Sequence, residues 1–318
     1  MKRLLFFLTL LFIPLLYISC YAQIADSTVT YYQALNQAEM RLPEFKDSED
    51  LLRLKLIQLA LINKSRKKYH AQPVKLDILA SRVANKMCKE AAENKYLGHW
   101  DMAGEKPYHR YAFAGGMDHV AENAASSSYS GKQTFAEEPK TYTEEMSKLH
   151  LDFMAERAPD DAHKKNCIEK EHNFVGIGAY RMDKEFRYYE EFIDRYYTFL
   201  QIPAQAAVNV PVTLELKPGA GNYFYYLIAF REDITPMTPS KISSRHHYDD
   251  FGPKKNLEFT PWALSEFRKD ATYEIPLTFN KPGYYYIAIY QSEKEYKKPT
   301  AFNTDGKIQA SGIVIEVK

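Results

Sequence analysis

Hydrophobic positions follow two different periods along the chain. Between residues 49 and 69, leucine and isoleucine crowd one broad face at helical spacing, and Asp47-Ser48 supplies a start signal. A second helical pattern begins near Asp77 and runs to Gly98, which suits a C-terminal cap. A third helix is predicted from about residue 142 to residue 157. The first half of the chain is therefore expected to be rich in helix.

Strands are predicted where short apolar runs alternate with turns. Two runs, 174–179 and 187–200, follow the third helix. Residues 99–116 and 126–131 hold few apolar positions and are expected to be loops. After Pro203 the helical pattern gives way to short β-rich runs. These runs lie at residues 210–216, 223–230, 272–278, 284–290 and 313–317.

The two periods predict an α+β protein with two domains, which a length of 318 residues allows. We expect a signal peptide at residues 1–22 and a lead-in segment at 23–48. A helix-rich domain is expected at 49–202, followed by an antiparallel β-sandwich at 203–318.

The net charge argues against a nucleic-acid partner. The whole chain carries +1, and loss of Lys2 and Arg3 with the leader would change this to −1. A surface for nucleic acid or anionic lipid would show a basic excess or a clustered basic stripe, and the sequence has neither.

The first 22 residues have the features of an export signal. Lys2 and Arg3 precede an apolar run from Leu4 to Ile18, which is shorter than the ~20 residues of a membrane span. Either cleavage follows Ala22, which the sequence favours, or Cys20 lies in a lipoprotein-type box and becomes the lipidated N-terminus. We expect no transmembrane span and a protein that is secreted, periplasmic or at the cell surface.

The other two cysteines, Cys88 and Cys167, have two possible states in an oxidising compartment. A bridge would close a loop of about 80 residues and stabilise the fold by up to ~4.5 kcal/mol. Alternatively, both are unpaired thiols in the core. The sequence does not decide between them.

Two histidines and a carboxylate are candidates for a shared site. His99, Glu122 and His163 stand 23 and 41 residues apart, each beside a different predicted element, so only the fold could bring them together. Neutral imidazoles and a carboxylate suit zinc, and such a site would weaken below about pH 6.5. A His-Glu-x-x-His helix, the commonest metalloprotease signature, is absent. Ordinary structural histidines are the alternative.

The order of several short motifs resembles the CAP superfamily, which includes cysteine-rich secretory proteins, antigen-five allergens and plant pathogenesis-related proteins. The resemblance is to the simpler bacterial members and covers roughly residues 50–200. The motif residues are Asn63 and Arg66, His99, Glu122-Asn123, His163 with Asn166, and Gly176-Ile177-Gly178.

This resemblance implies an α-β-α sandwich in which two histidines and one or two glutamates converge in a central cavity. His99, Glu122 and His163 match the first histidine, the first glutamate and the second histidine. Glu156 or Glu145 would be the second glutamate, with Glu156 preferred. The chain departs from the family pattern at two places, with Lys164 for an arginine and Phe153 for the usual tryptophan.

Other polar residues have weaker assignments. Asn123 and Arg110 are expected at the binding site, Asn123 by satisfying loop backbone and Arg110 through a salt bridge. For Glu122, a ligand role and a scaffold role remain equally open. His246-His247 with Asp249-Asp250 could bind a cation, but a solvated loop is the preferred interpretation.

We therefore expect a secreted, non-catalytic binding module whose cavity holds zinc, another divalent metal or a small ligand. One alternative is a metal-dependent hydrolase that uses His99, Glu122 and His163. Another is a structural surface or adhesion protein that acts through the β-domain. The expected partner is an unknown small ligand, glycan or protein at the cell surface.

Overall fold

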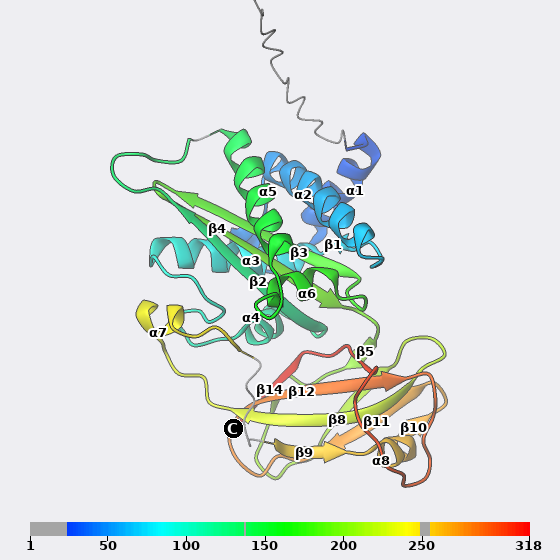
Figure 1. The fold of residues 1–318 in the computed structure, drawn as a ribbon. Coiled ribbons are helices and arrows are strands. Elements are labelled where there is room, and N and C mark those ends of the chain that lie inside the picture. The colour runs from blue at the N-terminus through cyan, green and yellow to red at the C-terminus, as the bar shows by residue number, and fades with distance from the viewer. Residues whose placement is uncertain (1–23, 137, 249–254) are drawn as a thin grey trace, which may run out of the picture.

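The computed structural model describes residues 24–136, 138–248 and 255–318. The expected signal peptide and Cys20 lie outside these ranges. Figure 1 shows two parts, a helix-covered sheet followed along the chain by a β-rich part. None of the helices in the described ranges is long and apolar enough to cross a membrane.

The first part is built on a four-stranded sheet. Its strands are β1 (Lys75–Leu76), β2 (His119–Ser128), β3 (Phe174–Met182) and β4 (Glu185–Asp194). Their order is β1-β3-β4-β2, so β2 pairs with β4 on one side and ends the sheet on the other. β3 and β4 form an antiparallel hairpin, whereas β1 pairs with β3 in parallel.

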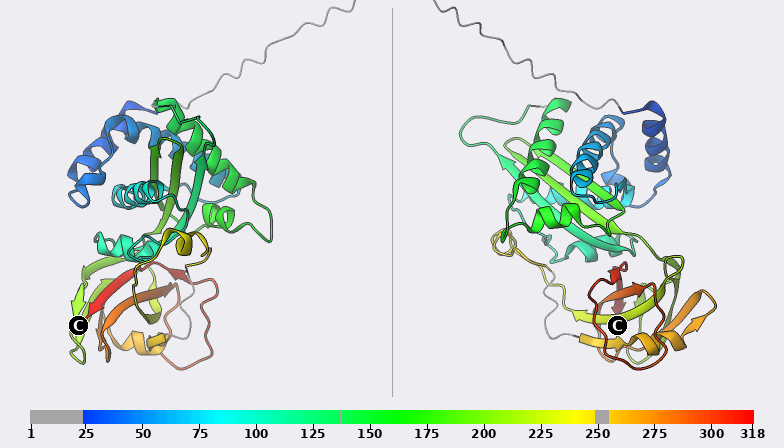
Figure 2. Two further views of the ribbon diagram at one scale, coloured as in Figure 1. Left: turned by 90° about the vertical axis from the view of Figure 1, so that its left-hand side faces the viewer. Right: turned by 45° about the vertical axis from the view of Figure 1, so that its right-hand side comes forward.

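Helices cover both faces of this sheet (Figures 1 and 2). α3 (Ile78–Glu93) packs on β3 and β4, with α4 (Pro107–Phe113) beside it. The other face carries α2 (Glu49–Lys68), α5 (Pro139–Ala155) and α6 (Ala162–Ile168). The first part is thus the expected α-β-α sandwich.

Local sequence signals explain how α2 and α3 begin. The side chain of Ser48 accepts a hydrogen bond from the backbone N–H of Leu51, and that of Asp77 accepts one from Ala80. Both are N-caps, which satisfy backbone donors that a helix leaves unpaired at its first turn. The start signals predicted from the sequence are confirmed.

Two glycines of β3 let α3 lie unusually close to the sheet. A Cβ atom at Gly176 would stand 2.4 Å from the carbonyl carbon of Ala80, and one at Gly178 would stand 2.4 Å from that of Ala84. No side chain fits at such distances. The Gly-Ile-Gly motif is therefore needed for helix packing.

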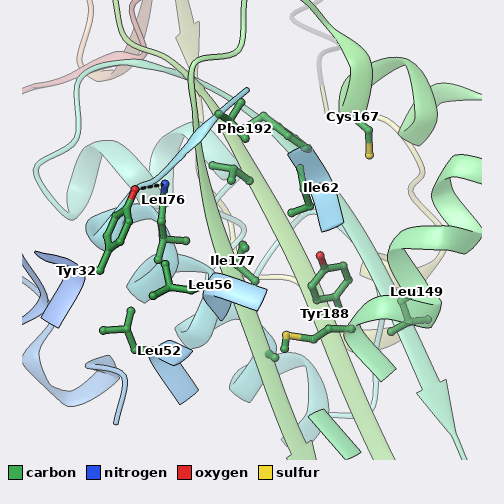
Figure 3. Packing of buried hydrophobic residues seen from close by; sticks show 14 of the residues in the cluster. Tyr32, Leu52, Leu56, Ile62, Leu76, Leu149, Cys167, Ile177, Tyr188 and Phe192 are labelled. Atoms are coloured by element: carbon green, nitrogen blue, oxygen red, sulfur yellow. Dashed lines mark hydrogen bonds between the residues drawn. The ribbon is translucent and has the colours of Figure 1, made fainter. Parts of the chain in front are cut away.

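A large core fills the space between the sheet and α2, α5 and α6 (Figure 3). Ile177, Tyr188 and Phe192 point into it and are fully buried. The expected lead-in segment also contributes, because α1 (Asp26–Ala38) places Tyr32 against this core. The Tyr32 hydroxyl accepts a hydrogen bond from the backbone N–H of Leu76 in β1.

The second part is a β-sandwich of two sheets, ordered β10-β11-β7-β5 and β6-β14-β12-β8-β9, with β13 beside β12. The pairs are antiparallel except that between β6 and β14. The five predicted strands match β7, β8, β11, β12 and β14. Its elements are β5 (Thr198–Gln201), β6 (Gln205–Ala206), β7 (Val212–Lys217), β8 (Tyr223–Glu232), α7 (Pro239–Ser243), β9 (Lys255–Phe259), α8 (Pro261–Glu266), β10 (Arg268–Lys269), β11 (Thr272–Leu277), β12 (Gly283–Ser292), β13 (Ile308–Gln309) and β14 (Ile313–Val317).

Several predicted elements were wrong in type or extent. Residues 99–116 contain α4, and the serine-rich stretch at 126–128 belongs to β2, because pairing with β4 along its length overrides low strand propensity. The expected strand at 187–200 is divided: β4 belongs to the first sheet and β5 pairs with β7. α3 ends at Glu93, followed by Lys95 at φ 56°, so Gly98 is not its cap.

Residues 233–248, which follow β8, return to the first part and pack on it. In Figure 1, α7 lies beside the loop that follows α3. The backbone N–H of Met237 donates to the carbonyl of Met102 at 3.0 Å. A Cβ at Gly98 would lie 2.7 Å from the Ile242 side chain, so Gly98 makes room for α7.

A buried ionic cluster also joins the two parts. Glu232, in β8, contacts Lys106 at 2.5 Å, the Tyr108 hydroxyl at 2.5 Å and His109 at 3.1 Å. Burial alone would raise the pKa of Glu232, but His109 and Lys106 outweigh it and lower that pKa to about 2. The Tyr108 ring stacks on Tyr286 of β12, with centroids 4.1 Å apart.

Candidate functional site

A cavity of about 620 Å³ lies along the outer edge of β2, where the two parts of the chain meet. Five consecutive residues of this strand, 119–123, line it. The remaining lining comes from both parts of the chain. The other lining residues are His99, Tyr108, Glu156, Asp160, Ala162, His163, Asn166, His246, His247, Tyr248, Tyr286 and Gln309.

On one side of β2, His99 is held by a buried carboxylate. Its Nδ1 lies 2.8 Å from Oε1 of Glu122, and the other oxygen of Glu122 accepts a bond from Arg110. Arg110 also donates to the backbone carbonyl of His99 at 2.7 Å. The predicted salt bridge of Arg110 is therefore present, and it fixes both His99 and Glu122.

The protonation states of this cluster follow from its burial. Burial, together with the charges of His163 and Arg110, lowers the pKa of His99 to about 3. Glu191 lies opposite Glu122 on β4, and burial and the Glu122 carboxylate raise the pKa of Glu191 well above its usual value. Burial therefore favours the neutral forms of both His99 and Glu191.

On the other side of β2, His163 makes a second histidine–glutamate pair. His163 Nδ1 lies 2.5 Å from Oε1 of Glu156, at the end of α5, and Phe153 stacks on the imidazole at 4.8 Å. The Asn123 amide donates to the backbone carbonyl of His163 at 3.1 Å. Glu145, the other candidate for the second glutamate, does not line the cavity.

The alternation of the strand explains why the two pairs lie apart. Glu122 faces Glu191 across the β2–β4 pair, while its neighbour Asn123 faces Glu190 on the opposite side of the sheet. Among the described residues, His99, Glu122 and His163 do not form a group of three ligand atoms within 4.8 Å of one another. The predicted site residues share one cavity without forming a compact three-ligand cage.

The hydrogen bonds of the two imidazoles define what the cavity can hold. Each Nδ1 contacts a glutamate, so Nε2 is the nitrogen left for a ligand in the cavity. Metal-binding histidines commonly have this arrangement, in which a carboxylate fixes the ring and its tautomer. The geometry therefore assigns Glu122 and Glu156 to orienting His99 and His163.

The sequence did not identify His119 as a cavity residue. His119 lies 2.7 Å from Asp194, whose second oxygen lies 2.6 Å from His172, and His172 in turn contacts Asn166 at 2.9 Å. His119 is three positions before Glu122 and stood in a stretch of low strand propensity. No local signal identified it.

The second part contributes a short segment, His246 to Tyr248, to the cavity wall. The Tyr248 hydroxyl accepts a 2.8 Å hydrogen bond from the backbone N–H of Glu122, and its ring lies 4.8 Å from that of His99. His246 and His247 are exposed on a loop, as the preferred interpretation of the sequence predicts, and they also line the cavity. Asp249-Asp250 lie outside the described residues.

Cys88 and Cys167 are both free and fully buried. Cys88 packs with Tyr189 on the α3 face of the sheet, and Cys167 packs with Tyr188 on the opposite face. The sheet separates them, so the alternative of two unpaired core thiols describes this fold.

Three solved structures are similar to parts of the chain. An extracellular protein with an SCP domain from Bacillus anthracis is 19% identical over 43% of this chain and 39% of its own, at a TM-score of 0.33. An outer surface protein from Borrelia burgdorferi is 17% identical over 45% of this chain and 93% of its own, at a TM-score of 0.35. The CAP domain of enterococcal PrgA is 12% identical over 54% of this chain and 80% of its own, at a TM-score of 0.28.

No curated protein matches the sequence. The model of the cysteine-rich secretory protein family, CAP, matches residues 59–198. This range contains α3, the whole β2–β4 sheet pair and the residues of both histidine–glutamate pairs. Residues 59–198 of this chain therefore form a domain of the cysteine-rich secretory protein (CAP) family.

Proposed function

We propose that this protein is a non-catalytic binding module whose cavity along β2 holds a divalent metal ion or a small metal-coordinating ligand. The observation that carries the proposal is the pair of imidazoles in one cavity, each fixed through Nδ1 by a glutamate. A cavity that holds only solvent would not need a glutamate to fix the orientation of each imidazole ring.

The donor chemistry suits zinc. Nε2 of His99 and of His163 would hold the ion, and water or a ligand group would complete its coordination. Burial lowers the pKa of His99 to about 3, so this imidazole is already neutral and needs no proton loss to coordinate. Because the two rings lie on opposite sides of β2, the ion would join the α4 side of the domain to the α6 side.

The metal-dependent hydrolase that the sequence also allowed is less well supported. A hydrolase of this kind needs a carboxylate free to accept a proton from water. Both oxygens of Glu122 are occupied by His99 and Arg110, and Glu156 binds His163 and the backbone N–H of Lys164. These contacts favour binding over catalysis.

The β-sandwich takes part in the proposed site, since Tyr248, Tyr286 and Gln309 complete the cavity wall. This argues against a β-domain that acts entirely by itself as an adhesion unit. We propose that the protein acts outside the cytoplasm, bound to a small ligand, glycan or protein at the cell surface. Lipid attachment at Cys20 remains a prediction from the sequence.

Zinc titration by calorimetry on the full chain, near neutral pH, tests the proposal. We expect Glu156→Gln to weaken binding about tenfold or more, because loss of an orienting carboxylate typically has that effect. Glu145→Gln, on the same helix but outside the cavity, is the matched control. A folded His99→Ala/His163→Ala variant that binds the same number of zinc ions as the wild type, with the same affinities, would refute the site.

A further inference from the structure

A second group of metal-binding side chains lies on the α5–α6 side of the sheet. His150 of α5, Cys167 of α6 and Glu190 of β4 each offer one ligand atom, and these atoms lie within 4.8 Å of one another. All three residues are fully buried. We propose that they form a buried zinc-binding site, separate from the cavity histidines.

The distances are close to those of a zinc site. Nδ1 of His150 lies 2.7 Å from Oε1 of Glu190, and Sγ of Cys167 lies 3.3 Å from Oε2. In a tetrahedral site with bonds of 2.0–2.3 Å, ligand atoms stand roughly 3.3–3.8 Å apart. Side-chain shifts of about 1 Å would therefore be enough to admit the ion.

The ligand set also fits zinc in type and charge. A thiolate, a carboxylate and a neutral imidazole together carry two negative charges, so Zn²⁺ makes the buried site neutral. Binding breaks the S–H bond of Cys167 as the Zn–S bond forms, and the proton leaves to solvent. Calcium and magnesium prefer all-oxygen sites, so sulfur and nitrogen donors argue against them.

Surrounding residues already hold the ligands in orientation. Nδ1 of His150 contacts Glu190 in this structure, and the other ring nitrogen, Nε2, lies 2.9 Å from the Ser65 hydroxyl. When Nδ1 binds the metal, Nε2–H can donate to that hydroxyl and hold the ring in place. The Tyr188 hydroxyl donates to Glu190 at 2.6 Å and accepts from Gln58 at 2.8 Å. Such outer partners accompany most protein metal sites.

Asn123 gives the ion a path from the cavity. It lines the cavity on one side, and its amide nitrogen lies 3.1 Å from Sγ of Cys167 and 3.3 Å from Oε2 of Glu190 on the other. Movement of this side chain would open the cluster and leave room for a water as the fourth ligand. The alternative is a metal-free polar network in the core, held by the same hydrogen bonds.

Cobalt titration of the reduced full chain distinguishes a zinc site from a metal-free network. Co²⁺ replaces zinc and gives a near-ultraviolet charge-transfer band only when a thiolate binds it. We expect the band in the wild type and in Cys88→Ala, with loss of the band in Cys167→Ala. It should persist in His99→Ala/His163→Ala, so failure of the cavity proposal would leave this one standing. Equimolar zinc should abolish it.

Absence of the band in the folded wild type, or its survival in Cys167→Ala, would overturn the proposal. Should Cys167→Ala fail to fold, Glu190→Gln provides the second test. This substitution preserves the shape of the side chain and most of its hydrogen bonds, but an amide is a poor metal ligand. The cobalt affinity measured from the band should therefore fall at least tenfold, while the circular dichroism spectrum stays unchanged. An unchanged affinity would show a metal-free network.

Discussion

Replacing Arg110 with methionine should destabilise the CAP domain strongly. Arg110 is 3% exposed and is the cation that binds the Glu122 carboxylate. The substitution keeps an unbranched side chain of similar reach but leaves a buried carboxylate without a partner. Breaking a buried pair in this way typically costs about 3–5 kcal/mol. Two backbone carbonyls, those of His99 and Glu105, also lose a donor.

Arg110→Met should also change how the free energy of unfolding depends on pH. Burial already raises the pKa of Glu122, and loss of Arg110 removes the main influence that lowers it. A carboxyl whose pKa is higher in the folded state than in the unfolded state destabilises the fold at pH above its ordinary value. In Arg110→Met the deficit relative to wild type should therefore shrink as the pH falls from neutral towards about 4.5.

Urea unfolding at several pH values measures both effects. Arg268→Met is the matched control, because the Arg268–Glu295 pair is partly exposed and should contribute less than about 1 kcal/mol. A loss below about 1 kcal/mol in Arg110→Met, or a loss that does not change with pH, would refute the picture of a buried carboxylate held by Arg110.

Three further predictions follow from the packing. Gly178→Val should cost about 3 kcal/mol or more by thermal unfolding, because Cβ would collide with α3, whereas Gly131→Asn in open space should cost little. The pKa of Glu232 is lowered to about 2, so its carboxylate should add about 2–3 kcal/mol to the free energy of unfolding above pH 4.5. This contribution should be lost as the pH falls towards 2, and acid unfolding of Glu232→Gln should lack this pH dependence. Peptide mapping without reduction should recover Cys88 and Cys167 as separate thiols, and a linked pair would contradict the fold.

The fold was predictable where a signal was local. Ser48 and Asp77 cap α2 and α3 as their sequence positions indicate, and alternating apolar residues revealed most long strands of the β-sandwich. β2 could not be recognised, because its serines and alanines form a strand only through pairing with β4. Gly98 looked like a helix cap, but its role depends on Ile242, which lies far along the chain.

The candidate site was predictable only where a motif in the sequence marked its residues. The family motif identified His99, Glu122 and His163 and left Glu156 or Glu145 as the second glutamate. The fold places the first three and Glu156 at one cavity. Contacts in the folded chain pair each glutamate with one histidine, which spacing in the sequence could not do. Tyr248 was beyond reach, because its contact with Glu122 depends on how the second part of the chain docks.

Anomalous X-ray diffraction at the zinc edge, on crystals of the full chain soaked in zinc, would locate the ion in the cavity. We expect an anomalous peak in the β2 cavity, bonded to Nε2 of His99 and Nε2 of His163, with Glu122 and Glu156 still on the Nδ1 atoms. A cavity without such a peak, or zinc bound there to other atoms, would show that the two imidazoles do not form a metal site.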